Sequence, residues 1–209
     1  MKKKLLLSLL SCCFLRLSAQ NFEFLAGHRN LTYQHAFTKN ASNASRFALT
    51  HIASVLVPVR QTERGRKLGA ELMNQGYLKF RIYKSLSLNA GGFYANSSGL
   101  KPSVAISYMV TRPHFLMIIQ PRTDVVRSPS IELFGLFEWR PVLTKHLLLY
   151  TRFQFMSNSG TCFHNRSYQQ LRIGFEVRAL QFGMGFQADE YGRSFSTRYN
   201  SGFFIRRQF

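Results

Sequence analysis

The chain has 209 residues, of which 28 are Lys or Arg and nine are Asp or Glu, so its formal net charge is +19 at pH 7. Hydrophobic residues make up 45% of the sequence, yet no apolar run reaches the roughly 18 residues that a membrane-spanning helix needs. The length suits a single domain, and the composition excludes a helical membrane protein.

Residues 1–20 have the organisation of a secretory signal peptide, with cleavage expected near Ala19. Lys2–Lys4 form a positive n-region, and Leu5–Leu10 begin the apolar segment that follows it. An alternative interpretation is a lipoprotein cleavage box, in which Cys12 is the lipidated residue. Either interpretation predicts export of the mature chain.

Removal of residues 1–20 takes four basic residues with it and lowers the formal charge from +19 to about +15. A soluble domain this basic would suggest nucleic acid, but export argues against that partner. The mature domain, residues 21–209, keeps Cys162 as its single thiol, so no internal disulfide is expected. Its charge suits the phosphates of lipopolysaccharide or a pore lining that favours anions, while many of these bases are equally compatible with solvated loops.

The mature chain repeats a pattern in which every second residue is apolar, which predicts strands. In residues 146–156, for example, Phe153 and Phe155 lie on one face, whereas Arg152 and Gln154 lie on the other. Polar turns separate eleven such strands, predicted over residues 28–38, 46–58, 70–83, 86–95, 102–111, 114–121, 130–140, 146–157, 167–178, 180–189 and 199–208.

A soluble β-sandwich alternates in the same way, but two features favour a barrel in a bacterial outer membrane. The apolar face is rich in Phe and Leu, and the opposite face carries acids and bases, as an enclosed lumen would. Short turns alternate with longer polar loops. Since closed bacterial barrels have an even number of strands, we expect an antiparallel transmembrane β-barrel of ten or twelve strands, with twelve preferred and one strand missed or split near the N-terminus.

The C-terminal strand resembles the assembly signal of outer-membrane barrels. Phe203, Ile205 and the terminal Phe209 share one face, which Arg207 interrupts. We therefore expect the barrel-assembly machinery to be a partner during insertion, alongside outer-membrane lipids.

Charged residues on the polar face are the main candidates for function. The residues predicted to face the lumen are Lys79, Arg81, Glu132, Glu138, Arg140, Arg152, Arg172, Glu176 and Arg178. In a narrow barrel these charges would pair and fill the lumen. In a wider barrel the surplus of bases would select anions.

A catalytic site is weakly indicated. Ser157 and His164 lie at the end of a predicted strand and in the loop after it, but no base stands beside Ser157 to activate its hydroxyl, and no orienting group is evident. The six histidines lack metal-ligand spacing, so neither a metal nor a cofactor is expected. His35 and His51 flank the first loop and are candidate cross-strand neighbours.

Three sequence blocks resemble small outer-membrane barrel proteins of the Bacteroidota. They are Asn165–Gly174, Asp189–Gly192 and Gly202–Arg206. The resemblance implies fold and location, but it brings no functional residues with it.

The sequence therefore predicts a non-enzymatic integral outer-membrane barrel, with a small porin-like channel or binder for anionic solutes as its leading function. The alternatives are a lipid A or phospholipid hydrolase with a site at the rim, and a closed structural barrel that serves a surface or secretion complex.

Overall fold

The computed structural model describes residues 20–42, 44–60, 62–63, 66–67 and 69–209. The predicted signal peptide, apart from Gln20, and the alternative lipidation site Cys12 lie outside these residues. The described chain is all-β, and it contains no helix long and apolar enough to cross a membrane.

Twelve long strands form the wall of the barrel. They are β1 (Gln20–Gly27), β2 (Asn30–Asn40), β3 (Phe47–Pro58), β6 (Glu71–Tyr83), β7 (Leu86–Ala95), β8 (Gly99–Arg112), β9 (Phe115–Asp124), β10 (Ile131–Trp139), β12 (Leu147–Ser159), β13 (His164–Val177), β14 (Leu180–Tyr191) and β15 (Ser196–Gln208). The short β4 (Thr62–Glu63) and β5 (Arg66–Lys67) form a ribbon of their own, and β11 (Val142–Thr144) pairs only with β12.

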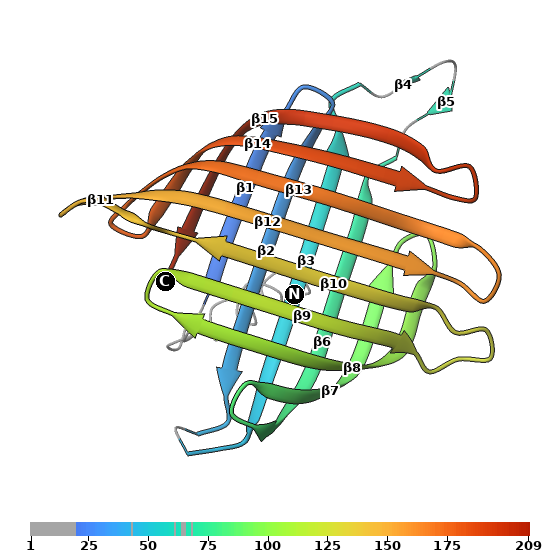
Figure 1. The fold of residues 1–209 in the computed structure, drawn as a ribbon. Coiled ribbons are helices and arrows are strands. Elements are labelled where there is room, and N and C mark those ends of the chain that lie inside the picture. Colours follow the sequence, from blue (N-terminus) through green and yellow to red (C-terminus); the bar gives the residue numbers. More distant parts are fainter. Residues whose placement is uncertain (1–19, 43, 61, 64–65, 68) are drawn as a thin grey trace, which may run out of the picture.

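The sheet closes on itself, because each strand pairs with its neighbours in antiparallel fashion and β1 pairs with β15. The register of that seam places Asn21 opposite Gln208 and Gly27 opposite Gly202. In Figure 1, β2, β3 and β6 run steeply behind β12, β13 and β14, which cross them, so two walls face each other across the lumen. The expected antiparallel barrel, with the preferred count of twelve strands, is confirmed.

The missed strand is β1. Its outward face is apolar at Phe22 and Phe24, but the inward residue Leu25 is also apolar and packs with Tyr150 and Phe204. That inward leucine breaks the alternation on which strand prediction depends. In addition, only His28 and Arg29 separate β1 from β2, so the sequence interpretation joined this turn to β2 as one strand, 28–38.

The outer face of the barrel is apolar over most strands, as a surface in contact with acyl chains requires. Large hydrophobic side chains remain exposed there, including Leu49, Leu78, Ile106, Ile173 and Phe203. The inward face is polar, and its buried residues include four arginines and several amides. This is the architecture of an integral outer-membrane barrel, and it places the protein in that membrane.

The two ends of the barrel differ. We call the end that holds Gln20 and Gln208 the terminal end, and the opposite end, with the connection 59–70, the loop end. Arg178 and Ala179 form a two-residue turn at the terminal end, with φ angles of 48° and 66°. Two successive positive φ values are the geometry of a tight hairpin turn that matches the strand twist.

Candidate functional site

The most densely charged part of the lumen is built around Glu23. Its carboxylate lies 2.6 Å from Arg152 Nη2 and 2.9 Å from Arg172 Nη2, and all three side chains are buried. Strands β12 and β13 supply the two arginines, whereas β1 supplies the acid. One carboxylate therefore holds two guanidinium groups from separate strands in the interior.

A second group of charges continues this cluster. Arg206 lies 2.8 Å from Glu138, and it also donates to the hydroxyl of Tyr150 at 2.6 Å and to Gln181 at 2.8 Å. Tyr150 in turn donates to Glu138 at 3.2 Å. Most polar groups of this network satisfy one another, which stabilises it in a low-dielectric interior, whereas Arg206 Nε has no hydrogen-bond partner among the described residues.

A third group lies towards the loop end on β9 and β10. Arg122 bonds to Asp124 at 2.8 Å and to Glu132 at 2.9 Å, and the Ser130 hydroxyl donates to Asp124 at 2.6 Å. Arg122 also stacks over the ring of Phe93, with 4.1 Å between its guanidinium carbon and the ring centroid. These partners fill the lumen beside β9 and β10.

One ion pair crosses the lumen. Arg166 on β13 lies 2.7 Å from Asp189 on the neighbouring β14, and 3.0 Å from Glu71 on β6. Tyr191 also donates to Glu71 at 3.1 Å. Because β6 and β13 are six places apart in the ring of twelve strands, the Glu71–Arg166 pair joins opposite walls at the loop end.

Acids and bases in these pairs are balanced. Among the described residues, seven inward carboxylates form ion pairs with seven bases: Glu23, Glu71, Asp124, Glu132, Glu138, Glu176 and Asp189 with Lys101, Arg122, Arg140, Arg152, Arg166, Arg172 and Arg206. We call the inward faces of β1, β9, β10 and β12–β15 the ion-pair wall.

The facing surface is different. The inward faces of β6, β7 and β8, which we call the amide–hydroxyl wall, carry buried neutral polar groups, listed here: Gln75, Tyr77, Ser87, Asn89, Ser103 and Ser107. Lys79 and Arg81 also face inward on β6, and no described carboxylate pairs with either. Arg81 donates to the backbone carbonyl of Ser45 at 3.1 Å.

The structure locates the lumen residues that the sequence predicted. Lys79, Arg81, Glu132, Glu138, Arg152, Arg172 and Glu176 face inward, and Arg140 lies at the terminal end, 3.6 Å from Glu176. The assignment of Arg178 was wrong, since this residue is exposed in the turn between β13 and β14. The sequence predicted that this strand ends at residue 178, whereas β13 ends at Val177 and Arg178 already belongs to the turn.

Important lumen residues were missed. Glu23 was overlooked because β1 itself was not predicted, although its position between Phe22 and Phe24 is a normal inward signal. Arg206 faces inward between Ile205 and Arg207 on the final strand. It was missed because the prediction for this strand concerned only its outward, aromatic face.

Outside the lumen, the weak catalytic candidates meet through a third residue. Ser157 Oγ lies 3.1 Å from Ser167 Oγ, and His164 Nε2 lies 2.8 Å from the same Ser167 Oγ. Ser157 and Ser167 are cross-strand partners on β12 and β13. No feature of the sequence pattern singled out Ser167.

Another outward histidine group lies on β2, β3 and β6. His35 Nε2 is 3.0 Å from His51 Nδ1, which confirms that the two are cross-strand neighbours, and His51 Nε2 is 2.9 Å from Asn74 Oδ1. In the described part of the chain, no three or more His, Cys, Asp or Glu residues gather as they would around a metal ion.

The residues of the predicted assembly signal all face outward. Phe203, Ile205 and Phe209 are exposed, and the guanidinium carbon of Arg207 lies 4.9 Å from the centroid of the Phe209 ring. Their role in insertion stays a prediction.

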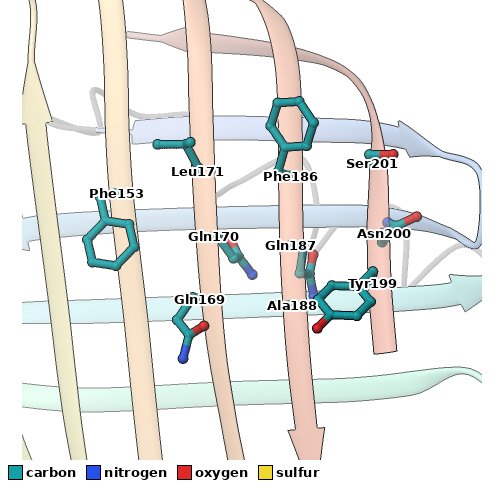
Figure 2. A pocket seen from close by; sticks show the side chains of 10 residues that line it. All are labelled: Phe153, Gln169, Gln170, Leu171, Phe186, Gln187, Ala188, Tyr199, Asn200 and Ser201. Carbon is teal, nitrogen blue, oxygen red and sulfur yellow. The ribbon is translucent and has the colours of Figure 1, made fainter. Parts of the chain in front are cut away.

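The outer wall also has a hollow of about 330 Å³ over β12–β15. Figure 2 shows Phe153, Leu171, Phe186 and Tyr199 spread around it over these four neighbouring strands. Ala188 lies between Gln169 and Tyr199 in one cross-strand row, and its short side chain leaves the space open.

Comparison with known proteins supports the fold. No family model matches the chain, and no curated protein matches it by sequence. Among solved structures, the chain is similar to the KdgM porin, with 8% identity, a TM-score of 0.50, and coverage of 91% of this chain and 99% of the porin. A structure titled "Unveiling the Mechanism Behind the in-meso Crystallization of Membrane Proteins" has 9% identity, a TM-score of 0.51, and coverage of 93% and 84%.

The NanC porin is similar at 10% identity, with a TM-score of 0.45 and coverage of 90% of this chain and 98% of that one. At such low identities the likeness describes the fold and carries no residue-level function. The resemblance to barrels of the Bacteroidota stays a prediction, because no sequence relative tests it.

Proposed function

We propose that this outer-membrane barrel binds small anionic solutes and passes them slowly along its amide–hydroxyl wall. The observation that carries the proposal is the pair of inward bases Lys79 and Arg81, which have no carboxylate partner among the described residues, whereas each of the seven inward carboxylates named above has a basic partner. Lys79 is half-buried in the lumen, and Arg81 is exposed on the same face of β6 nearer the terminal end, so two neighbouring positive charges attract an anion at that mouth of the barrel.

The neighbouring side chains suit a polar solute. Asn89 lies opposite Lys79 in the register, and Ser87 lies opposite Arg81. Amide and hydroxyl groups both donate and accept hydrogen bonds, so they can replace part of the hydration shell of a small anion. The similarity to the KdgM porin agrees with a porin-like barrel, but the solute is inferred from this chain alone.

The ion-pair wall limits the size of what can pass. Arg172 and Tyr150 are fully buried, and Glu71–Arg166 crosses the lumen at the loop end. A wide, water-filled pore is therefore not proposed. These contacts also support a second candidate function, a closed structural barrel that presents its loops to a surface or secretion complex.

Single-channel recording in planar bilayers separates the two candidates. We expect small openings with anion selectivity, and we expect Lys79→Gln with Arg81→Gln to reduce that selectivity. A matched control removes two exposed bases, Lys145→Gln with Arg127→Gln, and should retain most of the selectivity. Cation preference would contradict the anion proposal, and a complete absence of openings would favour the closed barrel.

Lipids are proposed as partners at the rims. Arg60, Arg127 and Arg193 are exposed at the loop end, where they suit the phosphates of lipopolysaccharide. The barrel-assembly machinery is a proposed partner during insertion, through Phe203, Ile205 and Phe209.

A further inference from the structure

The terminal end of the barrel carries an exposed base at every connection between strands. The connections at this end join β2 to β3, β6 to β7, β8 to β9, β10 to β12, and β13 to β14. Lys39 on β2 and Arg207 on β15 are exposed at the same end, so the bases follow the whole circumference of the sheet. We call these two residues, together with the exposed bases in or directly beside the connections, the basic rim: Lys39, Arg46, Lys84, Arg112, Lys145, Arg178 and Arg207.

The basic rim has no acidic counterpart. The sequences of the connections at the terminal end contain neither Asp nor Glu. Glu138 and Glu176, each one residue before the end of its strand, face inward and pair with Arg206 and Arg140. Within the described part of the chain, no rim base forms an ion pair. The positive charge of this rim is therefore open to an external anion.

Exposed aromatic side chains lie beside the rim bases on the outer wall. Lys84 Nζ lies 5.4 Å from the centroid of the Tyr83 ring, and Arg207 lies over the ring of Phe209. Trp139, at the terminal end of β10, is 56% exposed. In outer-membrane barrels such aromatic residues collect at the level of the lipid head groups. The rim bases therefore lie at the depth of the lipid phosphates.

The turns at this end are too short to carry the bases away from the membrane. Two residues join β6 to β7, β8 to β9, and β13 to β14. Bases on such turns reach the head groups of adjacent lipids, but they form no projecting surface for a soluble protein. In outer-membrane barrels the short turns face the periplasm, so the leaflet around this end is the one made of phospholipids.

We propose that the basic rim binds the phosphates of anionic phospholipids and holds a shell of these lipids around the terminal end. Each Lys or Arg near an anionic surface raises the affinity by about fivefold. The four rim arginines can in addition donate paired hydrogen bonds to a phosphate. This binding is separate from the loop-end bases proposed for lipopolysaccharide, and it does not depend on conduction through the lumen.

The chain contains a built-in reporter of this binding. Trp139 is its single tryptophan and lies on the outer face at the terminal end. Arg112, Phe115 and Trp139 form one cross-strand row, so Arg112 is two strand spacings, roughly 10 Å, from the indole. Lys145 lies in the connection that follows β10. Quenching of Trp139 fluorescence by lipids with brominated acyl chains therefore reports which lipids gather beside these two bases.

The test uses the full barrel folded into vesicles of phosphatidylglycerol and phosphatidylcholine, with first one lipid and then the other brominated. At low salt we expect phosphatidylglycerol to be preferred at Trp139 by at least about fivefold in the wild type and by less than about twofold in Arg112→Gln with Lys145→Gln. The wild-type preference should also fall in about 1 M salt, where the Debye length is about 3 Å.

Two further variants separate charge from turn structure. Arg112→Lys with Lys145→Arg keeps both charges and should retain the preference. His114→Gln with His146→Gln is the matched control, because these exposed histidines lie in the same two connections and a histidine is mostly neutral at about pH 8. Circular dichroism and heat-dependent gel migration show whether each variant folds.

The proposal is overturned if both lipids quench wild-type Trp139 equally at low salt, or if folded Arg112→Gln with Lys145→Gln keeps the wild-type preference. Competition identifies the lipid, since unbrominated phosphatidylglycerol should displace its brominated form from the neighbourhood of Trp139. Stronger displacement by lipid A would overturn the assignment to phospholipid.

Discussion

The two walls of the lumen stabilise their buried polar groups in different ways. The ion-pair wall places full charges in the interior and satisfies them with one another, as Glu23 does with Arg152 and Arg172. The amide–hydroxyl wall uses neutral groups, such as the Tyr77 hydroxyl 3.0 Å from Ser103 Oγ. The first arrangement is stable only while every partner is present, whereas the second tolerates the loss of one group.

The ion-pair wall therefore makes the barrel rigid, whereas the amide–hydroxyl wall is the surface that can bind a solute. Charges that are paired in the interior have little left to offer a solute, because each acid already has a basic partner. Two bases without a carboxylate partner among the described residues, Lys79 and Arg81, lie on the other wall, among groups that form weaker bonds. The charged residues most visible in the sequence therefore serve mainly to hold the barrel together.

The largest expected effect is on the ion-pair wall. Glu23→Gln leaves Arg152 and Arg172 buried without their counter-charge, and we expect a loss of about 3–5 kcal/mol in the free energy of unfolding. Denaturant titration of the barrel in vesicles measures this loss. The matched control is Glu190→Gln on the outer wall, where no ion pair is seen. Equal losses for the two variants would show that Glu23 does not organise this wall.

A smaller effect is expected on the amide–hydroxyl wall. Tyr77→Phe removes the hydrogen bond to Ser103 but keeps the ring, so the free energy of unfolding should fall by about 1 kcal/mol. The same denaturant titration applies. A loss as large as that of Glu23→Gln would contradict the distinction between the walls.

The alternation of apolar and polar residues along the sequence predicted most of the fold. It located eleven of the twelve long strands in outline and the outward face of residues such as Phe153, because a strand in contact with lipid must repeat with a period of two. It failed at β1, where Leu25 is apolar on the inward face, and at Arg178, where a tight turn ends the strand. At both positions the two-residue repeat of apolar side chains is interrupted locally.

The candidate sites depend on information that alternation does not contain. Glu23 meets Arg152 only because β1 closes the barrel against β15, 129 residues separating the two in the chain. His164 meets Ser167 only because a bulge shifts the register. Closure and bulges are properties of the assembled sheet, so charged and nucleophilic residues could be named from the sequence, but their partners could not.

The contact that joins the two walls gives the smallest expected change in stability. Glu71 and Arg166 are each about one-third exposed, at 32% and 29% of their side chains, so water screens the pair and Glu71→Gln should cost less than about 1 kcal/mol. Arg166 keeps Asp189 as its partner, so no charge is left buried alone.

Conductance should nevertheless rise in Glu71→Gln, because the Gln side chain no longer holds Arg166 across the lumen at the loop end. Planar-bilayer recording beside the wild type measures that rise, and Glu190→Gln, which removes one acid from the outer face, is the control. An unchanged conductance would mean that the passage is limited elsewhere, on the fully buried network around Arg172 and Tyr150.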